Sequence, residues 1–205
     1  MTDVFISYAR NDSDSVRVIY DALLAQKRSV WIDWHDIPLT AEWWKEITDG
    51  IEKSDNFVSM ITPSSLASPV CNLEIDCARA LNKRVIAILL METDEKSAHV
   101  ELVHRELNAF QQELLAGRDL LSIARDNWKV LAGLNWINFV SVAPFEQKFK
   151  DLIDALDTDI AYVHEHTRLL TRANEWYKRG KPATALLRGD ELRQAEAWLA
   201  NSGRK

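Results

Sequence analysis

Residues 3–10 read DVFISYAR, a short apolar run that stops at a polar turn, and this stretch decides the fold. The run predicts a buried strand over Val4–Tyr8. A second stretch, SPVCNLE at residues 68–74, places a lone carboxylate, that of Glu74, on the opening turn of a helix after the third predicted strand. In a doubly wound sheet both stretches end at the carboxyl edge of the strands, where such folds bind ligands. We therefore expect one ligand site that joins the two stretches.

Strand-like runs alternate with amphipathic helical patterns through residues 1–157, which is typical of βαβ units and a parallel sheet. The other predicted strands are 29–33, 56–62, 84–91 and 134–140, and the predicted helices are 12–27, 42–53, 71–81 and 144–156. The Ser/Pro-rich segment 63–69 is expected to be an irregular loop. The pattern thus predicts an α/β domain with five parallel strands.

The connection at about 92–131 is longer than the others. Apolar residues from Val103 to Leu114 at helical spacing predict one amphipathic helix that ends near Gly117, and 119–131 predicts a second. We expect this helical insertion to pack against the sheet domain; a partner-binding surface is the alternative.

The segment 158–205 carries helical patterns only, over Ile160–Lys178 and Asp190–Leu199. Residues 1–157 hold 16 Lys and Arg against 25 Asp and Glu, a net −9, whereas 158–205 hold 9 against 6, a net +3. Opposite charges attract, and so short a segment has too few apolar positions to fold alone. We expect this C-terminal all-α segment to dock on the sheet domain or on a neighbouring copy.

Composition excludes several classes of protein. A hydrophobic content of 47% and a charged content of 27% are ordinary for a globular protein. The sequence has no run of 18 apolar residues and no signal-peptide pattern, so we expect a cytoplasmic protein without a membrane partner. The net charge of −6 argues against a nucleic-acid partner.

Motif chemistry is sparse. The chain has no glycine-rich phosphate loop and no nucleophile elbow. Cys71 and Cys77 lie six residues apart and point to different faces of one helix, so no disulfide and no shared metal site is expected. Among the histidines, His164-x-His166 is the one close pair, and it is a weak metal signal because surface histidines are common.

The pattern Ser68-x-x-Cys71-x-x-Glu74, read with residues 3–10, resembles the TIR domain (Toll/interleukin-1 receptor type) over residues 1 to about 157. The resemblance implies a flavodoxin-like, five-stranded parallel sheet with helices on both faces. Residues 158–205 resemble the helical segment that follows bacterial TIR domains fused to larger C-terminal modules. The residues that carry this resemblance are His164…Arg168-Leu169-Leu170…Glu175-Trp176…Leu186-Leu187-Arg188-Gly189…Ala195-Glu196…Trp198-Leu199. We therefore expect the chain to be the front end of a longer protein.

The resemblance also implies a function. NAD-cleaving members use a glutamate at the position of Glu74, so we expect an NAD glycohydrolase or cyclase that releases nicotinamide, with NAD as substrate and no cofactor or metal. The nicotinamide departs without protonation, and one carboxylate beside the developing oxocarbenium ion can suffice. Activation by self-assembly into homo-oligomers or filaments, in bacterial defence or stress signalling, is implied as well. A first-turn glutamate that complements the helix dipole is the alternative for Glu74. A non-catalytic TIR scaffold is the alternative for the chain.

Further substrate contacts are implied by the same resemblance. The turn after the first strand is expected to contact diphosphate and ribose, and Arg10 pairs either with phosphate or with Asp12 or Asp36. Asp33 and Asp36 are expected to shape the loop that follows. Relatives often carry Trp at the position of Val70, so here an aromatic wall must come from among Trp31, Trp34, Trp43 and Trp44; Trp31 is expected in the core, and Trp43 matches the nicotinamide pocket best. The substrate-binding candidates are Ser7, Tyr8, Ala9, Arg10, Trp34, Asp36, Trp43 and Cys71, and the self-association candidates are the apolar loop residues Ile37, Pro38 and Leu39.

Overall fold

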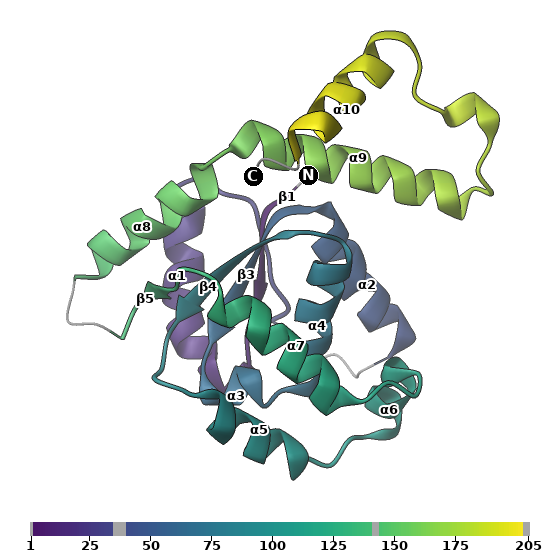
Figure 1. Ribbon diagram of the computed structural model, residues 1–205. Coiled ribbons are helices and arrows are strands. Elements are labelled where there is room, and N and C mark those ends of the chain that lie inside the picture. Colours follow the sequence, from purple (N-terminus) through teal and green to yellow (C-terminus); the bar gives the residue numbers. More distant parts are fainter. Residues whose placement is uncertain (1, 35–39, 141–143, 203–205) are drawn as a thin grey trace.

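The computed structural model describes residues 2–34, 40–140 and 144–202. Its strands form one all-parallel sheet with the order β2-β1-β3-β4-β5 (Figure 1). The strands are β1 (Thr2–Ser7), β2 (Val30–Trp31), β3 (Ser54–Ile61), β4 (Arg84–Leu89) and β5 (Ile137–Asn138). This order confirms the predicted α/β, flavodoxin-like sheet. The chain leaves β1 in one direction to form β2 and in the other to form β3, so a ligand crevice is expected between the carboxyl ends of β1 and β3.

Helices cover both faces of the sheet because its strands are apolar on both sides. On one face, Phe5, Phe57 and Leu89 pack against α2 (Ala41–Lys53), α4 (Pro69–Ala80) and α7 (Leu120–Ala132). On the other face, Ile6 and Val58 pack against α1 (Ser13–Ala25), which follows the short η1 (Arg10–Asp12), and against α8 (Phe145–Asp157). Alternate residues of each strand thus serve two separate cores. Figure 1 shows the helices on the two faces of the sheet.

The segment 63–69 is not an irregular loop. Residues Pro63–Leu66 form a short helix, α3, because Thr62 and Ser65 make a reciprocal capping box and Pro63 occupies the first helical turn. Serine and proline therefore start a helix here, whereas their presence in 63–69 had predicted an irregular loop. Helix α4 follows after two residues, capped by the Ser68 hydroxyl, which accepts from the Cys71 amide.

The long insertion is also divided differently from the prediction. Two helices, α5 (Glu95–Val103) and α6 (Ala109–Leu115), replace the single helix expected from Val103 to Leu114, because Asn108 makes its own capping box and starts a new helix. Val103 is exposed rather than part of an apolar stripe. The second predicted helix is confirmed as α7, and Leu73 of α4 shares a core with α5, α6 and α7. The insertion packs on the sheet domain, as expected.

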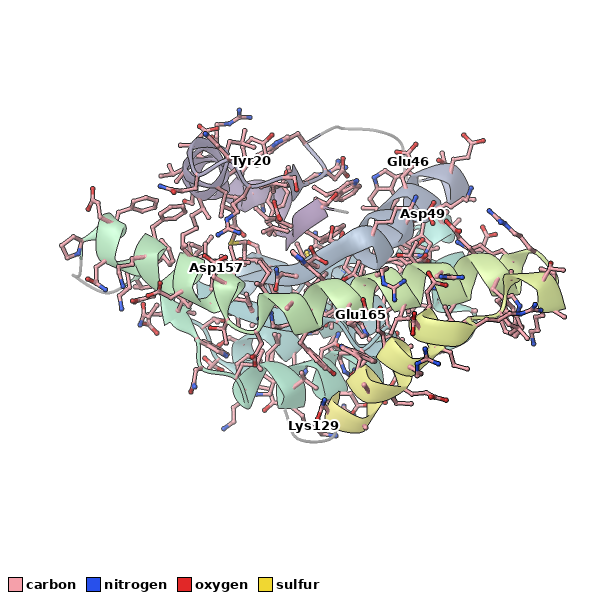
Figure 2. All side chains as sticks on the ribbon, turned by 90° about the horizontal axis from the view of Figure 1, so that it is seen from above. Tyr20, Glu46, Asp49, Lys129, Asp157 and Glu165 are labelled. Carbon is pink, nitrogen blue, oxygen red and sulfur yellow. The ribbon has the colours of Figure 1, made fainter. Side chains whose placement is uncertain are left out.

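The C-terminal segment contains α9 (Ile160–Lys178), η2 (Ala183–Ala185) and α10 (Gly189–Ser202). Helix α9 contacts β3 and α2 across the end of the sheet where β1 and β3 begin, and α10 folds back beside α9 (Figures 1 and 2). Val163 and Thr167 of α9 are buried. Trp198 of α10 stacks on Tyr162 and donates its indole N–H to the Tyr162 carbonyl. The side chains of Leu192 and Leu199 on α10 are exposed.

Strands β2 and β5 have two residues each, shorter than the segments 29–33 and 134–140 that were predicted. Both are edge strands, where pairing on one side only lets the ladder end early. Among the described helices, none has the length and apolar character needed to cross a bilayer.

Candidate functional site

Glu74 lies at the carboxyl edge of the sheet, but not where the sequence analysis placed it. Helix α4 begins at Pro69, so Glu74 belongs to the second turn, and α4 has no acidic residue in its first turn. The side chain turns inward to the end of β1 and is only 6% exposed. Ser7 donates a 2.6 Å hydrogen bond from Oγ to Glu74 Oε2. The helix-dipole alternative is therefore wrong, and so is the picture of an exposed first-turn carboxylate.

Burial gives this carboxylate an unusual titration. The pKa of Glu74 is raised to about 8, mainly because burial removes water from the carboxylate. The Ser7 hydrogen bond acts in the opposite direction, and the nearby Asp33 carboxylate adds to the increase. A carboxylate whose pKa is shifted this far by burial and a specific partner marks a candidate functional group. Glu74 is poised to lose its proton when a cationic group enters beside it.

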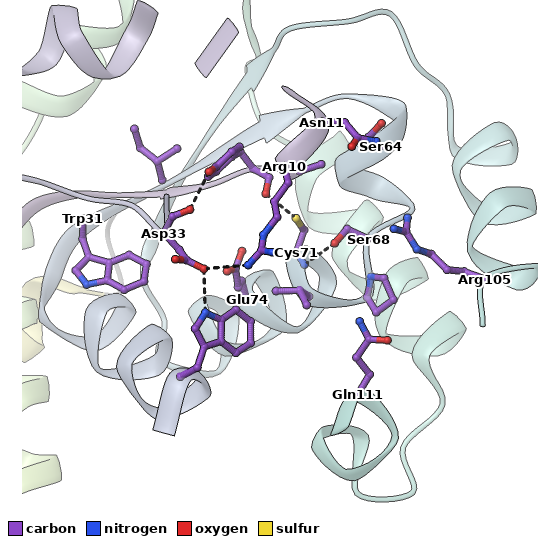
Figure 3. A pocket seen from close by; sticks show the side chains of 16 residues that line it. Arg10, Asn11, Trp31, Asp33, Ser64, Ser68, Cys71, Glu74, Arg105 and Gln111 are labelled. Atoms are coloured by element: carbon purple, nitrogen blue, oxygen red, sulfur yellow. Dashed lines mark hydrogen bonds and ion pairs between the residues drawn. The ribbon is translucent and has the colours of Figure 1, made fainter. Parts of the chain in front are cut away.

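A pocket of about 280 Å³ opens over this carboxylate (Figure 3). Its walls come from the turn after β1, the end of β2, the start of α2, the segment 64–71 and the insertion. The lining residues are Ile6, Tyr8, Ala9, Arg10, Asn11, Trp31, Asp33, Trp43, Ser64, Ser68, Pro69, Val70, Cys71, Glu74, Arg105 and Gln111. The predicted crevice between the carboxyl ends of β1 and β3 thus contains the residues of both opening stretches.

Two tryptophans form aromatic walls of the pocket. Trp43 is buried, and its ring is held by a 2.9 Å hydrogen bond from Nε1 to Asp33 Oδ2. Trp31 stacks on Phe5 with ring centroids 4.6 Å apart. Gly50 makes room for it, since a Cβ at that position would lie 2.8 Å from the indole ring. Trp43 is the site-facing member of the pair Trp43 and Trp44, as expected, and Trp31 lines the pocket as well as the core.

Asp33 organises the polar side of the pocket. Its backbone carbonyl accepts a 2.8 Å hydrogen bond from the Tyr8 hydroxyl, and its carboxylate accepts from Trp43 and pairs with Arg10 at 3.7 Å (Figure 3). Arg10 therefore pairs with Asp33 rather than Asp12, whose carboxylate is held by the Thr62 hydroxyl. The Arg10 side chain is half exposed, so its guanidinium can reach an anionic group at the mouth of the pocket.

Cys71 lines the pocket but is not activated as a nucleophile. Its thiol donates to the Tyr8 carbonyl at 3.3 Å. Burial, and then the Glu74 carboxylate, raise the pKa of the Cys71 thiol to about 12. Because the thiolate is the reactive form of cysteine, this side chain serves as a wall.

The structure gathers most, but not all, of the predicted substrate-binding residues. Tyr8, Ala9, Arg10, Trp43 and Cys71 line the pocket, while the Ser7 hydroxyl lies behind it, occupied by Glu74.

Trp34 has one ring contact with the described pocket residues, that with Tyr8. It packs on the other core, against Tyr8 and Tyr20 and beneath the Arg17 guanidinium, and it does not line the pocket. Asp36 and the predicted self-association residues Ile37, Pro38 and Leu39 lie outside the described residues.

Several pocket residues were not predicted from the sequence, among them Asn11, Ser64, Arg105 and Gln111. Arg105 and Gln111 both come from the insertion, more than thirty residues after Glu74 in the chain. Arg105 is anchored by a 3.2 Å hydrogen bond from Nη1 to the Ala67 carbonyl. Only the packing of α5 and α6 beside α4 brings them here, and the Asn108 capping motif was the one local signal for the break that lets Arg105 turn inward.

Comparisons with known proteins identify the family of the chain. A profile of the TIR domain family matches residues 4–113. A Cytobacillus dafuensis protein named as a candidate cyclic ADP-D-ribose synthase, TIR2, is 31% identical over 105 residues, which cover 48% of this chain and 28% of that protein. The chain therefore spans little more than a quarter of the length of this relative.

One solved structure supports the fold, and a second is a weaker match. The TIR domains of a structure described as the activated Roq1 resistosome, directly recognizing the pathogen effector XopQ, match with a TM-score of 0.59 at 15% identity. The match covers 76% of this chain and 99% of that chain. The TIR domain of the Toll-related receptor TRR-2 from Hydra magnipapillata matches with a TM-score of 0.40 at 18% identity, over 62% of this chain and 98% of that chain.

Proposed function

Since the chain belongs to the TIR domain family, we propose that it cleaves NAD at the bond between nicotinamide and ribose, with Glu74 as the catalytic carboxylate. The relative named as a candidate cyclic ADP-D-ribose synthase supports chemistry on this class of substrate. Release of nicotinamide is common to a glycohydrolase and a cyclase, and the proposal includes both.

The observation that carries the proposal is the combination of one buried carboxylate with aromatic walls. The positively charged nicotinamide ring is flat, and indole faces attract such cations. Trp43 and Trp31 line the pocket with indole rings, although Phe5 stacks on Trp31, and Glu74 and Asp33 supply negative charge on the same pocket. Arg10 adds a cation at the mouth, where the diphosphate of the same substrate would lie. This charge pattern suits a ligand with a cationic ring at one end and phosphates at the other.

The role of Glu74 follows from the charge that develops in the reaction. As neutral nicotinamide leaves, positive charge builds up on the ribose ring, and a carboxylate beside it stabilises that charge. The cationic ring of bound NAD favours the ionised form of Glu74, which opposes the effect of burial on its pKa. Without substrate Glu74 is mostly neutral, so the free protein avoids most of the free-energy cost of burying a charge. With substrate bound, the cationic ring stabilises the ionised form.

The size of the pocket supports a requirement for assembly. Pockets for drug-sized ligands span about 300–1,000 Å³, so 280 Å³ accommodates only part of a dinucleotide. We infer that nicotinamide and its ribose enter the pocket and that a neighbouring copy of the domain covers the rest. The TIR domains of the Roq1 structure come from an assembled resistosome, which supports TIR–TIR association as the means.

Incubation of concentrated protein with NAD tests the proposal directly. Nicotinamide and the nucleotide products are resolved by chromatography, and the ratio of linear to cyclic ADP-ribose assigns the reaction type. We expect nicotinamide release whose rate per molecule rises with protein concentration. If no nicotinamide appears even under crowded conditions while the protein self-associates, the chain is a scaffold that acts through TIR–TIR contacts.

A further inference from the structure

Three ligand-type side chains meet at the edge of the sheet opposite the pocket. They are Asp3 near the start of β1, Asp55 near the start of β3, and His164 on α9. One ligand atom from each lies within 4.8 Å of the other two. His164 Nε2 is 3.2 Å from Asp55 Oδ2. The three residues are far apart in the sequence, so no motif spacing predicts that they meet.

Asp55 is incompletely satisfied in a way that points to a ligand. Its side chain is only 3% exposed, and its second oxygen, Oδ1, is buried without a hydrogen-bond partner among the described residues. A buried carboxylate oxygen without a partner costs free energy comparable to a lost hydrogen bond to a charged group. A bound cation beside Asp55 would remove that cost.

The surrounding residues hold the cluster in place. Ser29 donates to Asp3 Oδ2 from its amide at 2.6 Å and from its hydroxyl at 2.8 Å. Such hydrogen bonds to a carboxylate are the usual means by which a protein orients a metal ligand before the metal binds. His164 is fixed by its place on α9, where Thr167, one turn later, is buried against the sheet.

Lys83 is a neighbouring cation that attracts the Asp55 carboxylate, but its hydrogen bonds go to other residues. Its ammonium donates to the Ser54 carbonyl at 2.7 Å and to the Thr167 hydroxyl at 3.2 Å, and no ion pair joins it to Asp3 or Asp55 in the described part of the chain. A cation that enters between the three side chains therefore displaces no salt bridge of Lys83 among the described residues.

We propose that Asp3, Asp55 and His164 bind a divalent transition-metal cation. An imidazole nitrogen with two carboxylates suits Zn²⁺ or Mn²⁺, whereas Mg²⁺ prefers oxygen ligands alone and retains its waters. Three protein ligands leave coordination positions for water. Because β1, β3 and α9 each supply one ligand, the metal would tie the C-terminal segment to the sheet domain. The site is about a strand length from the pocket, so it stabilises the molecule and takes no part in NAD cleavage.

The test measures metal binding and thermal stability in the full chain. The protein is stripped with a chelator, and calorimetric titrations with ZnCl₂, MnCl₂ and MgCl₂ are compared with melting curves. We expect binding of one Zn²⁺ or Mn²⁺ per chain, a higher Tm with metal, and no response to Mg²⁺. His164→Ala and Asp55→Asn should each weaken binding at least about tenfold, as loss of metal-shell residues commonly does. If Asp55→Asn does not fold, His164→Ala alone decides, because His164 is partly exposed.

His99→Ala is the matched control. His99 also lies on a helix beside a carboxylate, with Nδ1 3.7 Å from Glu95 Oε1, but it lacks a third ligand among the described residues. This variant should bind metal and melt as the natural sequence does. Equal metal binding by His164→Ala and the natural protein would overturn the proposal, and so would the absence of binding at micromolar concentrations of Zn²⁺ and Mn²⁺.

Discussion

At the scale of single residues, the central feature is a carboxylate whose position the sequence predicts and whose environment it does not. The Ser-x-x-Cys-x-x-Glu spacing placed Glu74 at the ligand edge, and the 2.6 Å contact with Ser7 brings the two opening stretches together. Its burial could not be predicted, because the face of α4 that meets the sheet is set by packing between elements distant in the sequence. Arg105 could not be predicted either, since only tertiary packing brings it to the pocket.

Replacement of Glu74 by Gln should stabilise the protein in a pH-dependent way. Burial raises the pKa of Glu74 to about 8, above its value in the unfolded chain, so the native state is most stable when the group is neutral. The stabilisation that the native state gains from neutral Glu74 is fully present below about pH 4.5 and is lost as the pH rises to about 8. Gln avoids the loss, so the variant should gain up to a few kcal/mol over the natural protein at pH 8.5 and much less at pH 5. Urea unfolding at the two pH values measures this, and an equal difference at both would contradict the assigned burial.

Replacement of Ser7 by Ala should shift the pH dependence of NAD cleavage. The Ser7 hydroxyl stabilises the ionised form of Glu74, so its loss raises the pKa of Glu74 further. The acidic limb of kcat/KM should move to higher pH by about one unit, since a hydrogen bond to a charged group contributes roughly 1.5–3 kcal/mol. Ser59→Ala is the control, because Ser59 is equally buried and pairs with Ser7 in the sheet register. Identical pH profiles for Ser7→Ala and Ser59→Ala would show that the Ser7 hydroxyl does not control the pKa of Glu74.

At the scale of elements, local signals predicted the elements that bury one regular face. The α2 prediction differs from the structure by one residue, and α9 agrees at both ends. The failures occurred where side chains cap helices: Ser65 starts α3 with Thr62, and Asn108 divides the insertion into α5 and α6. That division matters for function, because Arg105 lies in the break and turns to the pocket.

Arg105→Ala should raise the KM for NAD several-fold and leave kcat nearly unchanged. Arg105 lies at the wall of the pocket away from Glu74 and is expected to contact the anionic part of the substrate (Figure 3). Loss of such a contact weakens ground-state and transition-state binding alike. Initial-rate kinetics measure the split, with Arg125→Ala on the exposed face of α7 as control. A fall in kcat at unchanged KM would show that the insertion acts on the chemistry and not on binding.

At the scale of the whole molecule, the pocket occupies one end of the sheet and the C-terminal segment covers the other. Helix α9 contacts β3 and α2, and Lys178 pairs with Asp49 and Glu52 at 3.7 Å each. The opposite net charges of the two segments predicted such an attraction, but not that α9 would cover the beginnings of the strands. No sequence pattern links His164 to Asp3 and Asp55, so the cluster of these three residues could not be predicted from the sequence.

Deletion of residues 158–205 should lower the Tm by several degrees without abolishing NAD cleavage. The deletion exposes Asp55 and Lys83 and removes the buried Val163 and Thr167, but it leaves all the pocket residues in place. Melting curves and nicotinamide release measure the two effects. A truncated protein with unchanged Tm would show that α9 contributes nothing to the sheet domain. Loss of cleavage in a folded truncated protein would place the segment in the catalytic machinery.

The most direct test of the central claim is the rate of nicotinamide release from NAD by the Glu74→Gln protein at high concentration. Glu52→Gln serves as the matched control, because Glu52 is equally buried but lies on α2 near α9, away from the pocket. We expect the natural protein and Glu52→Gln to release nicotinamide at similar rates, and Glu74→Gln, folded and at least as stable, to release none above background. Undiminished release by Glu74→Gln would contradict the assignment of Glu74 as the catalytic carboxylate.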